Sequence, residues 1–465
     1  MTLQLSIIEW SQKGAIPFHD ARSKQMNTKA VVIAGSNSGC GKTTVSLGLM
    51  AAFKKRGLAV QGFKVGPDYI DPSLHRIITD SPSINLDTWM MPENFLCHAF
   101  SSRAERADIS IIEGVMGLYD GKSPTSDDGS TAELAVKLNL PVILVINAKS
   151  MARTAAAIVK GLIDFNPELN IIGVVFNQVS SARHLEILTD AVNKYCGVNV
   201  LGGLNTIAFT IPSRHLGLYM GEDNILQPDH INYLADQITK SIDLNTLLSL
   251  STITCQTYDF NMPENQKTDK RLAIAKDKAF CFYYQDNIDI LNALGYEIIE
   301  FSPMNDKKLP ENIDVYYFGG GYPELYAQSL SDNLEMLKSI YHKSNEGKII
   351  YAECGGLMYL GKSITTTSHH KYSMAGCFDY ETYMMNTFQS LGYVEIQPKT
   401  NFFILNKDKK LRGHSFHYSK IKFKNDSDNF YSGTPISKAL GYRKKNTLAS
   451  YVHLHFSHLF QRDKS

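Results

Sequence analysis

The sequence predicts a two-domain α/β protein in which each domain is built on a parallel β-sheet covered by helices. The chain has 465 residues, too many for a single hydrophobic core. Its first half alternates apolar strands with helical segments, which is typical of a parallel sheet with helices on both faces. A polar, charged stretch then interrupts the pattern, and a second strand–helix series follows it.

The first domain is placed at residues 29–245. Its five predicted strands are apolar segments at 30–35, 59–64, 108–113, 141–147 and 170–176. Residues 1–28 lack such a pattern and are interpreted as an extension, with disorder as one interpretation. We expect residues 1–25 to be either a dispensable extension or the result of a misplaced start. Ligands of parallel sheets gather at the carboxyl ends of the strands, so we expect the functional residues there.

Residues 246–270 are interpreted as a linker, and residues 271–465 as the second domain. Four strands are predicted in its first part, at 272–276, 296–301, 314–318 and 348–352. A strand-rich tail follows from 373 to 456. We find no internal repeat and no low-complexity segment.

Composition excludes several classes of function. The net charge of +1 predicts no broad surface for nucleic acid or an acidic membrane. No apolar run approaches the length of about 18 residues that a membrane-spanning helix needs. Residues 1–28 contain Glu9 and Asp20 and no continuous apolar segment, which argues against a secretory signal. The seven cysteines form no C-x-x-C pair, which indicates a reducing compartment, so we expect a cytoplasmic protein.

A glycine-rich segment after the first predicted strand indicates a phosphate-binding loop. Residues 35–44 read Gly-Ser-Asn-Ser-Gly-Cys-Gly-Lys-Thr-Thr, and an amphipathic helix is predicted from Val45 to Phe53. Backbone N–H groups and the helix start would hold phosphates, Lys42 would reach the outer phosphates, and Thr43 would bind Mg²⁺. Ser36 replaces the usual glycine, so the loop is a variant, and a chance glycine-rich turn is the alternative.

A second motif places a cysteine on a sharp turn. An apolar strand runs into Cys354, which Gly355 and Gly356 and a predicted helix follow. Small neighbours permit a strained turn that exposes a nucleophile, and the helix start is expected to lower the pKa of the thiol. The N–H of Gly355 and those of the glycines at 319–321 could form an oxyanion hole. A buried structural cysteine is the alternative, which we adopt for the other six.

The general base for this cysteine must come from elsewhere in the chain. His453 is the first candidate, in an alternating strand near the C-terminus. His414, His417 and His455 compete with it. Histidines in such strands are more often structural than catalytic, so residue pattern alone does not choose among them.

Six motifs occur together in one order. They are Phe63-Lys-Val-Gly-Pro-Asp-Tyr-Ile-Asp-Pro, Glu113-Gly-Val-Met-Gly-Leu-Tyr-Asp-Gly, Pro212-Ser-Arg-His-Leu-Gly-Leu, Ala279-Phe-Cys-Phe-Tyr-Tyr, Gly319-Gly-Gly-Tyr-Pro-Glu and Glu353-Cys-Gly-Gly. In this combination, over residues 30–460, the chain resembles the cobyrinic acid a,c-diamide synthase family. The first half is similar to dethiobiotin synthetase-like P-loop proteins, and the second half to class I glutamine amidotransferases.

The resemblance implies an ATP-dependent amidation. ATP would phosphorylate a carboxylate of a corrin-type tetrapyrrole, and ammonia released from glutamine at Cys354 would convert it to an amide, at side chains a and c in turn. An acyl phosphate is needed because a free carboxylate has no adequate leaving group.

The resemblance also assigns roles to residues. It implies the following ATP-binding residues: Gly39, Cys40, Gly41, Lys42, Thr43, Thr44 and Lys64. It implies that Thr43, Asp68 and Glu113 bind Mg²⁺, that Tyr69 and Asp120 contact the substrate, and that Cys354 and His453 are catalytic. The oxyanion hole would comprise Gly320, Gly321 and Gly355. Asn177 could recognise adenine, and Arg214 and His215 could face the same pocket. Aspartates beside glycine or proline also cap turns, which is the alternative for Asp68 and Asp120.

The sequence leaves open the third residue of the catalytic triad, the substrate and the oligomeric state. Class I amidotransferases carry His-x-Glu, whereas this chain has His453-Leu-His455, so a Cys–His dyad is indicated. The same amidation of hydrogenobyrinate or a nickel sirohydrochlorin is the nearest alternative function, and cobyric acid synthase is another. A regulatory P-loop ATPase with a degenerate amidotransferase-like appendage belongs to a different class, and Cys354 argues against it. The sequence does not decide whether the chain forms a homodimer.

Overall fold

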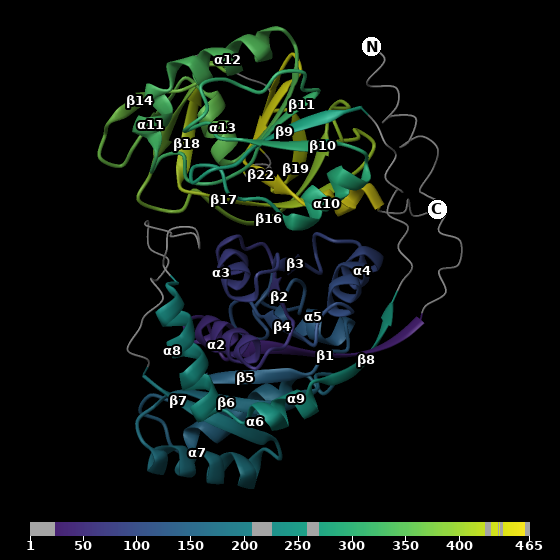
Figure 1. The fold of residues 1–465 in the computed structure, drawn as a ribbon, viewed down its shortest axis with the longest axis vertical. Helices are drawn as coiled ribbons and strands as arrows, with labels where there is room; N and C mark the ends of the chain where they lie inside the picture. The colour runs from purple at the N-terminus through teal and green to yellow at the C-terminus, as the bar shows by residue number, and fades with distance from the viewer. Residues whose placement is uncertain are drawn as a thin grey trace. The chain divides into compact units, whose positions relative to one another are not determined.

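The computed structural model describes residues 24–206, 226–257, 269–423, 429–435, 437 and 440–460. The chain divides between Phe260 and Asn261 into two compact units, each an α/β structure (Figure 1). The predicted two-domain α/β class is therefore confirmed.

The first unit contains an eight-stranded sheet with the order β3-β2-β4-β1-β5-β6-β7, and β8 pairs with β1. All neighbouring strands are parallel except β8, which is antiparallel to β1. The strands are β1 (Lys24–Gly35), β2 (Val60–Val65), β3 (Ile84–Leu86), β4 (Ile109–Glu113), β5 (Val142–Asn147), β6 (Ile171–Val179), β7 (Asn199–Asn205) and β8 (Thr252–Thr257). The five predicted strands correspond to β1, β2, β4, β5 and β6.

Helices connect these strands. They are α2 (Lys42–Lys55), α3 (Ile70–Thr79), α4 (Glu93–Ala104), α5 (Thr131–Lys137), α6 (Thr154–Phe165), α7 (Ala182–Tyr195), α8 (Pro228–Ser241) and α9 (Leu244–Leu250). The expected amphipathic character of Val45–Phe53 is wrong, because all nine residues are buried. Helix α2 packs against the sheet and also against α3 and α8, which leaves it no solvent-facing side over that stretch (Figure 1).

Two predicted boundaries of the first unit need correction. Residues 246–257, expected in the linker, belong to the end of α9 and to β8. Strand β8 returns to pair with Lys24–Lys29 of β1, so β1 starts before the predicted domain start at residue 29. Pairing across more than 200 residues leaves no local sequence signal. The rest of the predicted extension and residues 258–268 of the linker lie outside the described residues.

The second unit is built on a six-stranded sheet with the order β10-β9-β11-β12-β21-β20. Its strands are β9 (Arg271–Ala275), β10 (Glu297–Phe301), β11 (Val315–Phe318), β12 (Ile349–Glu353), β20 (Gly441–Lys444) and β21 (Thr447–Ser450). The strands are parallel except for the β20–β21 hairpin. The predicted strands of this domain correspond to β9, β10, β11 and β12. The helices are α10 (Gln285–Ala293), α11 (Ala327–Asp332), α12 (Leu334–Asn345) and α13 (Gly355–Leu360).

The predicted strand-rich tail forms two smaller sheets beside this one. Their orders are β14-β13-β15-β18 and β19-β16-β17-β22. The strands are β13 (Ser363–Thr365), β14 (Lys371–Ser373), β15 (Tyr380–Met384), β16 (Ser390–Pro398), β17 (Leu411–His417), β18 (Ser419–Phe423), β19 (Tyr431–Thr434) and β22 (Val452–Leu454), and a 3-10 helix, η2, spans Phe456–Phe460. The second of these sheets brings His453 next to His414 by cross-strand pairing.

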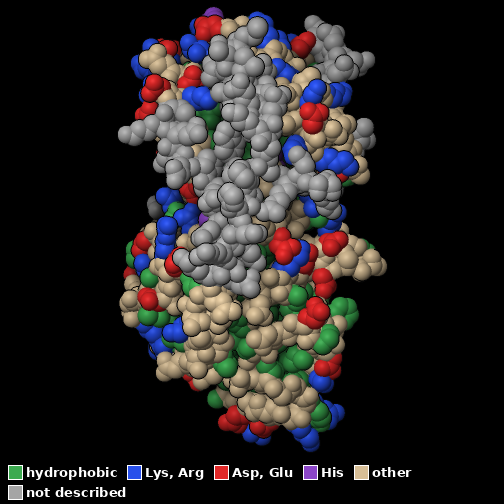
Figure 2. Space-filling model, turned by 90° about the vertical axis from the view of Figure 1, so that its right-hand side faces the viewer, with side chains coloured by type: hydrophobic (Ala, Val, Ile, Leu, Met, Phe, Trp, Pro, Cys, Tyr) green, Lys and Arg blue, Asp and Glu red, His purple; other side chains and the backbone are tan. Residues whose placement is uncertain are grey.

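Figure 2 shows one face of the surface. Among the described residues on this face, acidic and basic side chains are interspersed, and neither sign forms a broad patch. No helix of the described residues is long and apolar enough to cross a membrane.

Candidate functional site

The glycine-rich loop lies where the sequence predicts it, between the end of β1 and the start of α2. Strand β1 has β4 on one side and β5 on the other, so the loop occupies the position where the connections diverge to the two halves of the sheet. Gly39 and Gly41 have φ angles of 79° and 107°, in the left-handed region that glycine tolerates. A Cβ at Gly41 would also lie 2.0 Å from Asn177 Nδ2.

Lys42 folds back over this loop. Its Nζ donates a hydrogen bond of 3.1 Å to the carbonyl of Asn37. Burial lowers the pKa of Lys42, and the positive charge of Lys64 adds to the effect. The ammonium group is thus bonded to the backbone of the loop itself.

Thr43, Lys64 and Glu113 meet at the carboxyl ends of the strands. Register pairs Lys64 of β2 with Glu113 of β4, and Glu113 with Ile33 of β1. The Thr43 hydroxyl donates a hydrogen bond of 2.6 Å to Glu113 Oε1, and Lys64 Nζ lies 3.3 Å from the same oxygen. A hydroxyl beside a carboxylate is a donor set that fits Mg²⁺.

Two residues that the sequence did not assign complete this cluster. Lys64 Nζ forms an ion pair of 2.7 Å with Asp71, and His75 Nε2 lies 2.9 Å from Glu113 Oε2. Burial by itself would lower the pKa of Lys64, but Asp71, Glu113 and Asp68 outweigh it and raise the pKa. Lys64 is therefore a permanent cation. The spacing of Asp71 and His75 on α3, one turn apart, is the only sequence signal for the pair.

The other predicted residues of this unit have structural contacts. Asp68 Oδ1 accepts hydrogen bonds from the N–H groups of Ile70 and Asp71, and so caps the start of α3 beside Tyr69. Asp120 accepts a hydrogen bond of 2.9 Å from the N–H of Gly117 and fixes a turn. The Asn177 amide donates to the Cys40 carbonyl at 3.0 Å, which ties the loop to β6. Arg214 and His215 lie outside the described residues.

In the second unit, Cys354 stands on the strained turn that the sequence predicts. It lies between β12 and α13 with φ 46° and ψ −98°, a conformation that costs energy for a residue with a Cβ. The expected lowering of its pKa is wrong. Burial raises the pKa of the Cys354 thiol to about 12, and the carboxylates of Glu324 and Glu353 add to the effect. The helix that follows has only six residues.

His453 lies beside the glycine loop that follows β11. A Cβ at Gly320 would lie 2.5 Å from His453 Cε1, so glycine at 320 makes room for the imidazole. The His453 ring stacks on His414, with centroids 4.8 Å apart. Its pKa is lowered well below the usual value by burial, and His414 and His417 contribute. The imidazole is therefore neutral and can accept a proton.

The predicted oxyanion residues converge beside Cys354. A Cβ at Gly355 would lie 3.0 Å from the backbone nitrogen of Gly321, so the two loops touch through their backbones. The Gly320 carbonyl accepts hydrogen bonds from the N–H groups of Cys281 and Phe282, which fixes the orientation of this loop. The Gly319 N–H donates a hydrogen bond of 2.8 Å to the Tyr283 hydroxyl, so it holds the loop in place and does not face an oxyanion.

The competing histidines have other partners. His417 Nδ1 lies 2.8 Å from the Ser419 carbonyl, and its ring stacks on Tyr451. His455 Nδ1 lies 2.8 Å from Ser457 Oγ, and its Nε2 is 3.5 Å from Asp286 Oδ2. The described geometry therefore sets His453 apart by its contact with Gly320.

Both halves of the chain match known protein families. Residues 31–215 match the model of the CobQ/CobB/MinD/ParA nucleotide binding domain, and residues 271–459 match the CobB/CobQ-like glutamine amidotransferase domain. The cobyrinate a,c-diamide synthase of Listeria innocua is 43% identical over 92% of this chain and 96% of its own length. The enzyme of the same name from Priestia megaterium is 39% identical over 93% and 95%. The chain belongs to the cobyrinate a,c-diamide synthase family.

Membership of this family confirms the resemblance that the six motifs carry. Another relative with the same name, from Picrophilus torridus, is 43% identical over 93% of the chain and 96% of its own length. A solved glutamine amidotransferase aligns with 40% of this chain and 90% of its own length, at 16% identity and a TM-score of 0.29, which is too weak for an argument. The chain is thus a glutamine-dependent ligase with a nucleotide-binding domain.

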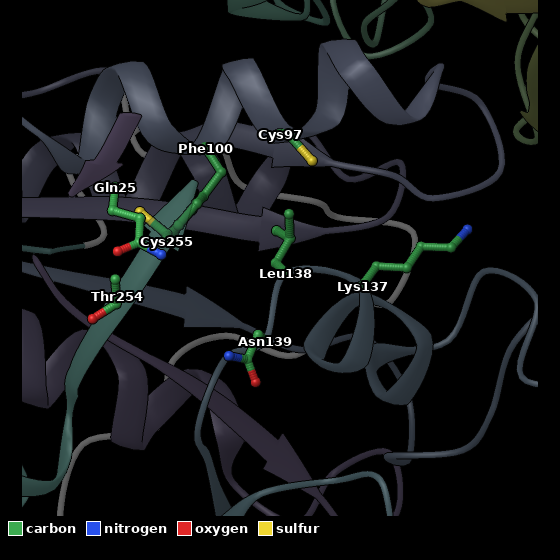
Figure 3. Close-up of a pocket in the computed structure, with 8 residues that line it drawn as sticks. All are labelled: Gln25, Cys97, Phe100, Lys137, Leu138, Asn139, Thr254 and Cys255. Atoms are coloured by element: carbon green, nitrogen blue, oxygen red, sulfur yellow. The ribbon is translucent and has the colours of Figure 1, made fainter. Parts of the chain in front are cut away.

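A cavity of about 330 Å³ lies elsewhere in the first unit (Figure 3). Cys97 and Phe100 reach it from α4, Lys137–Asn139 from the end of α5, and Gln25, Thr254 and Cys255 from the β1–β8 ribbon. None of the predicted site residues lines it. Burial raises the pKa of Cys97 to about 11, and Glu93 and Cys255 contribute, so this thiol is not activated.

The contact between Gly320 and His453 gives a testable prediction. Gly320→Ala places a methyl group against the imidazole, and a displacement of about 1 Å is expected to slow glutamine hydrolysis about 100-fold. Activity with ammonia should stay near that of the wild type. The control is Gly161→Ala, in α6, where a Cβ meets nothing within 4 Å. Equal glutaminase rates for Gly320→Ala and the control would contradict the position of His453.

Proposed function

We propose that the chain converts two carboxylates of cobyrinate, a and c, to amides with ATP and glutamine. Support comes from the full-length relationship to cobyrinate a,c-diamide synthases, together with a phosphate-type loop in one unit and a cysteine elbow in the other. The relationship over more than 90% of the chain is the observation that carries the proposal.

The first unit activates the acid. The carboxylate oxygen of the substrate attacks the γ-phosphorus of ATP, ADP leaves, and an acyl phosphate forms. The N–H groups of Gly39, Cys40 and Gly41 and the side chains of Lys42 and Thr44 hold the phosphates. Lys64, a permanent cation fixed by Asp71, neutralises the charge on the transferring group. Tyr69, at the start of α3, and Asp120 are the candidates for contact with the substrate.

Mg²⁺ is proposed as the metal cofactor. Thr43 and Glu113 would hold it, with Asp68 as a further ligand, and the rest of its shell would come from phosphate oxygens and water. Bound there, it would neutralise phosphate charge. Within the described residues, no three His, Cys, Asp or Glu side chains form a group suited to a metal ion.

The second unit releases ammonia. As Cys354 Sγ attacks the amide carbon of glutamine, its proton passes to His453, which then protonates the leaving nitrogen. The N–H groups of Gly320, Gly321 and Gly355 stabilise the oxyanion. Water hydrolyses the resulting thioester to glutamate. The ammonia nitrogen then attacks the acyl phosphate, phosphate leaves and the amide remains.

The proposal is tested by product mass. The protein is incubated with ATP, Mg²⁺, glutamine and, separately, cobyrinate, hydrogenobyrinate and nickel sirohydrochlorin. We expect cobyrinate to lose about 1 Da per amidation, twice, because each OH is exchanged for NH₂ on an activated carboxylate. Amidation of another tetrapyrrole in preference to cobyrinate would show that this tetrapyrrole, and not cobyrinate, is the substrate. No amidation of any acceptor, with no use of glutamine, would contradict the proposed function.

A further inference from the structure

Glu353 precedes Cys354 in the chain, and its carboxylate lies near His453. It is the last residue of β12, directly before Cys354, and its side chain is 2% exposed. Register pairs Glu353 with Ser450 of β21, and the chain then turns through Tyr451 into β22, which carries His453. As a result, Glu353 Oε2 lies 3.8 Å from His453 Nδ1.

The carboxylate of Glu353 is held in place by three donors. The Tyr351 hydroxyl donates to Oε1 at 2.7 Å, and the Leu454 N–H donates to the same oxygen at 3.2 Å. The Tyr317 hydroxyl donates to Oε2 at 3.0 Å. Such donors fix the direction of a buried carboxylate and support its charge.

The carboxylate that usually orients the histidine of a class I amidotransferase is missing from its place in this sequence. In His-x-Glu the acid stands two residues after the base, and here that residue is His455. Its ring is turned to Ser457 and Asp286 and packs against Tyr284, with ring centroids 5.1 Å apart. Glu353 approaches the same histidine from the neighbouring strand instead.

We propose that Glu353 is the positioning residue for His453, so that the strand carrying the nucleophile also supplies the acid that orients its base. The inference rests on the proposed roles of Cys354 and His453. A histidine that takes a proton on one nitrogen must keep its proton on the other, and a carboxylate facing that N–H stabilises the imidazolium. A shift of about 1 Å shortens the 3.8 Å separation to a hydrogen bond.

The surroundings of Glu353 give the proposal a pH signature. Burial raises the pKa of Glu353 to about 7, while Tyr351, Leu454 and Tyr317 hold it lower than burial alone would. The other titratable groups facing the pair are tyrosines, histidines and a thiol with pKa values shifted away from neutrality: Tyr283, Tyr317, Tyr351, Tyr431, His414, His417 and Cys354. Glu324, near Cys354, is the exception, because burial raises its pKa to about 7 as well.

The experiment uses the full chain with ATP and the tetrapyrrole acceptor, and measures glutamine hydrolysis from about pH 5.5 to 9. The wild-type rate should rise with pH through about 7, since the carboxylate is the active form. Glu353→Gln should lower kcat about 100-fold with little change in KM for glutamine, and should flatten this rise. Amidation with ammonia should be unchanged.

Tyr351→Phe is the matched variant. It keeps the ring and the carboxylate but removes a donor that lowers the pKa of Glu353, so the rise should move to higher pH. Because Glu324 has no such contact with Tyr351, a shifted rise separates the two acids. If Glu353→Gln does not fold, the shift of the pH profile in Tyr351→Phe alone tests the role of Glu353.

Two results would overturn the inference: an unchanged kcat and pH profile in Glu353→Gln, or an unshifted profile in Tyr351→Phe. Cys354→Ala separates this failure from that of the proposed function. If Cys354→Ala still hydrolyses glutamine, the assignment of the nucleophile is wrong and the inference falls with it. If Cys354→Ala is inactive and Glu353→Gln is normal, only the inference is wrong.

Discussion

Cys354→Ala is expected to abolish amidation with glutamine while leaving amidation with ammonia close to the wild-type rate. Loss of the nucleophile removes the covalent path, and glutamine hydrolysis should fall at least about a thousandfold. The first unit does not depend on the thiol, so acyl phosphate formation should continue. Ammonia added at high pH, where more of it is unprotonated, then replaces glutamine.

The measurement is the rate of amide product with each nitrogen source, at equal protein and ATP. Cys377→Ala serves as the control, because Cys377 is also a free, buried cysteine of the second unit but stands on no such turn. A Cys354→Ala variant that still uses glutamine would contradict the proposed chemistry. One that loses both nitrogen sources would show that the thiol supports the fold and not only the reaction.

Local sequence patterns were sufficient to predict the glycine-rich loop and the turn at Cys354. Gly39 and Gly41 adopt the left-handed conformations that the loop requires, and Cys354 adopts the strained turn that Gly355 and Gly356 permit. Each depends on backbone geometry within a few residues. The strands that carry these motifs were predictable for the same reason, because buried parallel strands are short apolar runs.

Partners from distant segments were not predictable. Glu113 meets Lys64 because of the register between β4 and β2. Glu353 meets His453 because of the register between β12 and β21 and the return of the chain into β22. One sequence holds no record of such register. The sequence predicts a linker where β8 lies, because the strand that pairs with β8 is more than 200 residues earlier in the chain.

The pKa of Cys354 is set by burial and not by the helix start that follows it. A helix start stabilises a nearby anion by about 0.3–1 kcal/mol. Each unit of pKa corresponds to about 1.4 kcal/mol. The rise of the Cys354 pKa from its ordinary value of 9.0 to about 12 therefore exceeds the contribution of the helix start several times over. The sequence shows the helix start but not the depth of the site. The thiol is consequently protonated and the imidazole neutral, so in the proposed reaction proton transfer would accompany attack.

Lys42→Ala is expected to stop amidation with either nitrogen source. The lysine bends over the glycine-rich loop, and Lys64, which Asp71 and Glu113 hold in its own place, cannot take over the contacts of Lys42 with the loop. Without it the charge on the transferring phosphoryl group is poorly neutralised, and the rate should fall at least about 100-fold. The measurement is amide formation with glutamine and with ammonia, alongside ADP release.

The matched control is Lys55→Ala at the other end of the same helix. Lys55 is half exposed and pairs with Asp236, so its removal should leave the rate unchanged. Glutamine hydrolysis by Lys42→Ala, measured with ATP and the acceptor present, distinguishes the two halves of the reaction. If Lys42→Ala retained full activity with ammonia, the phosphate role of the loop would be wrong. If it lost amidation but still released glutamate, glutamine hydrolysis would run without an acceptor ready for the nitrogen, as expected when activation alone has failed.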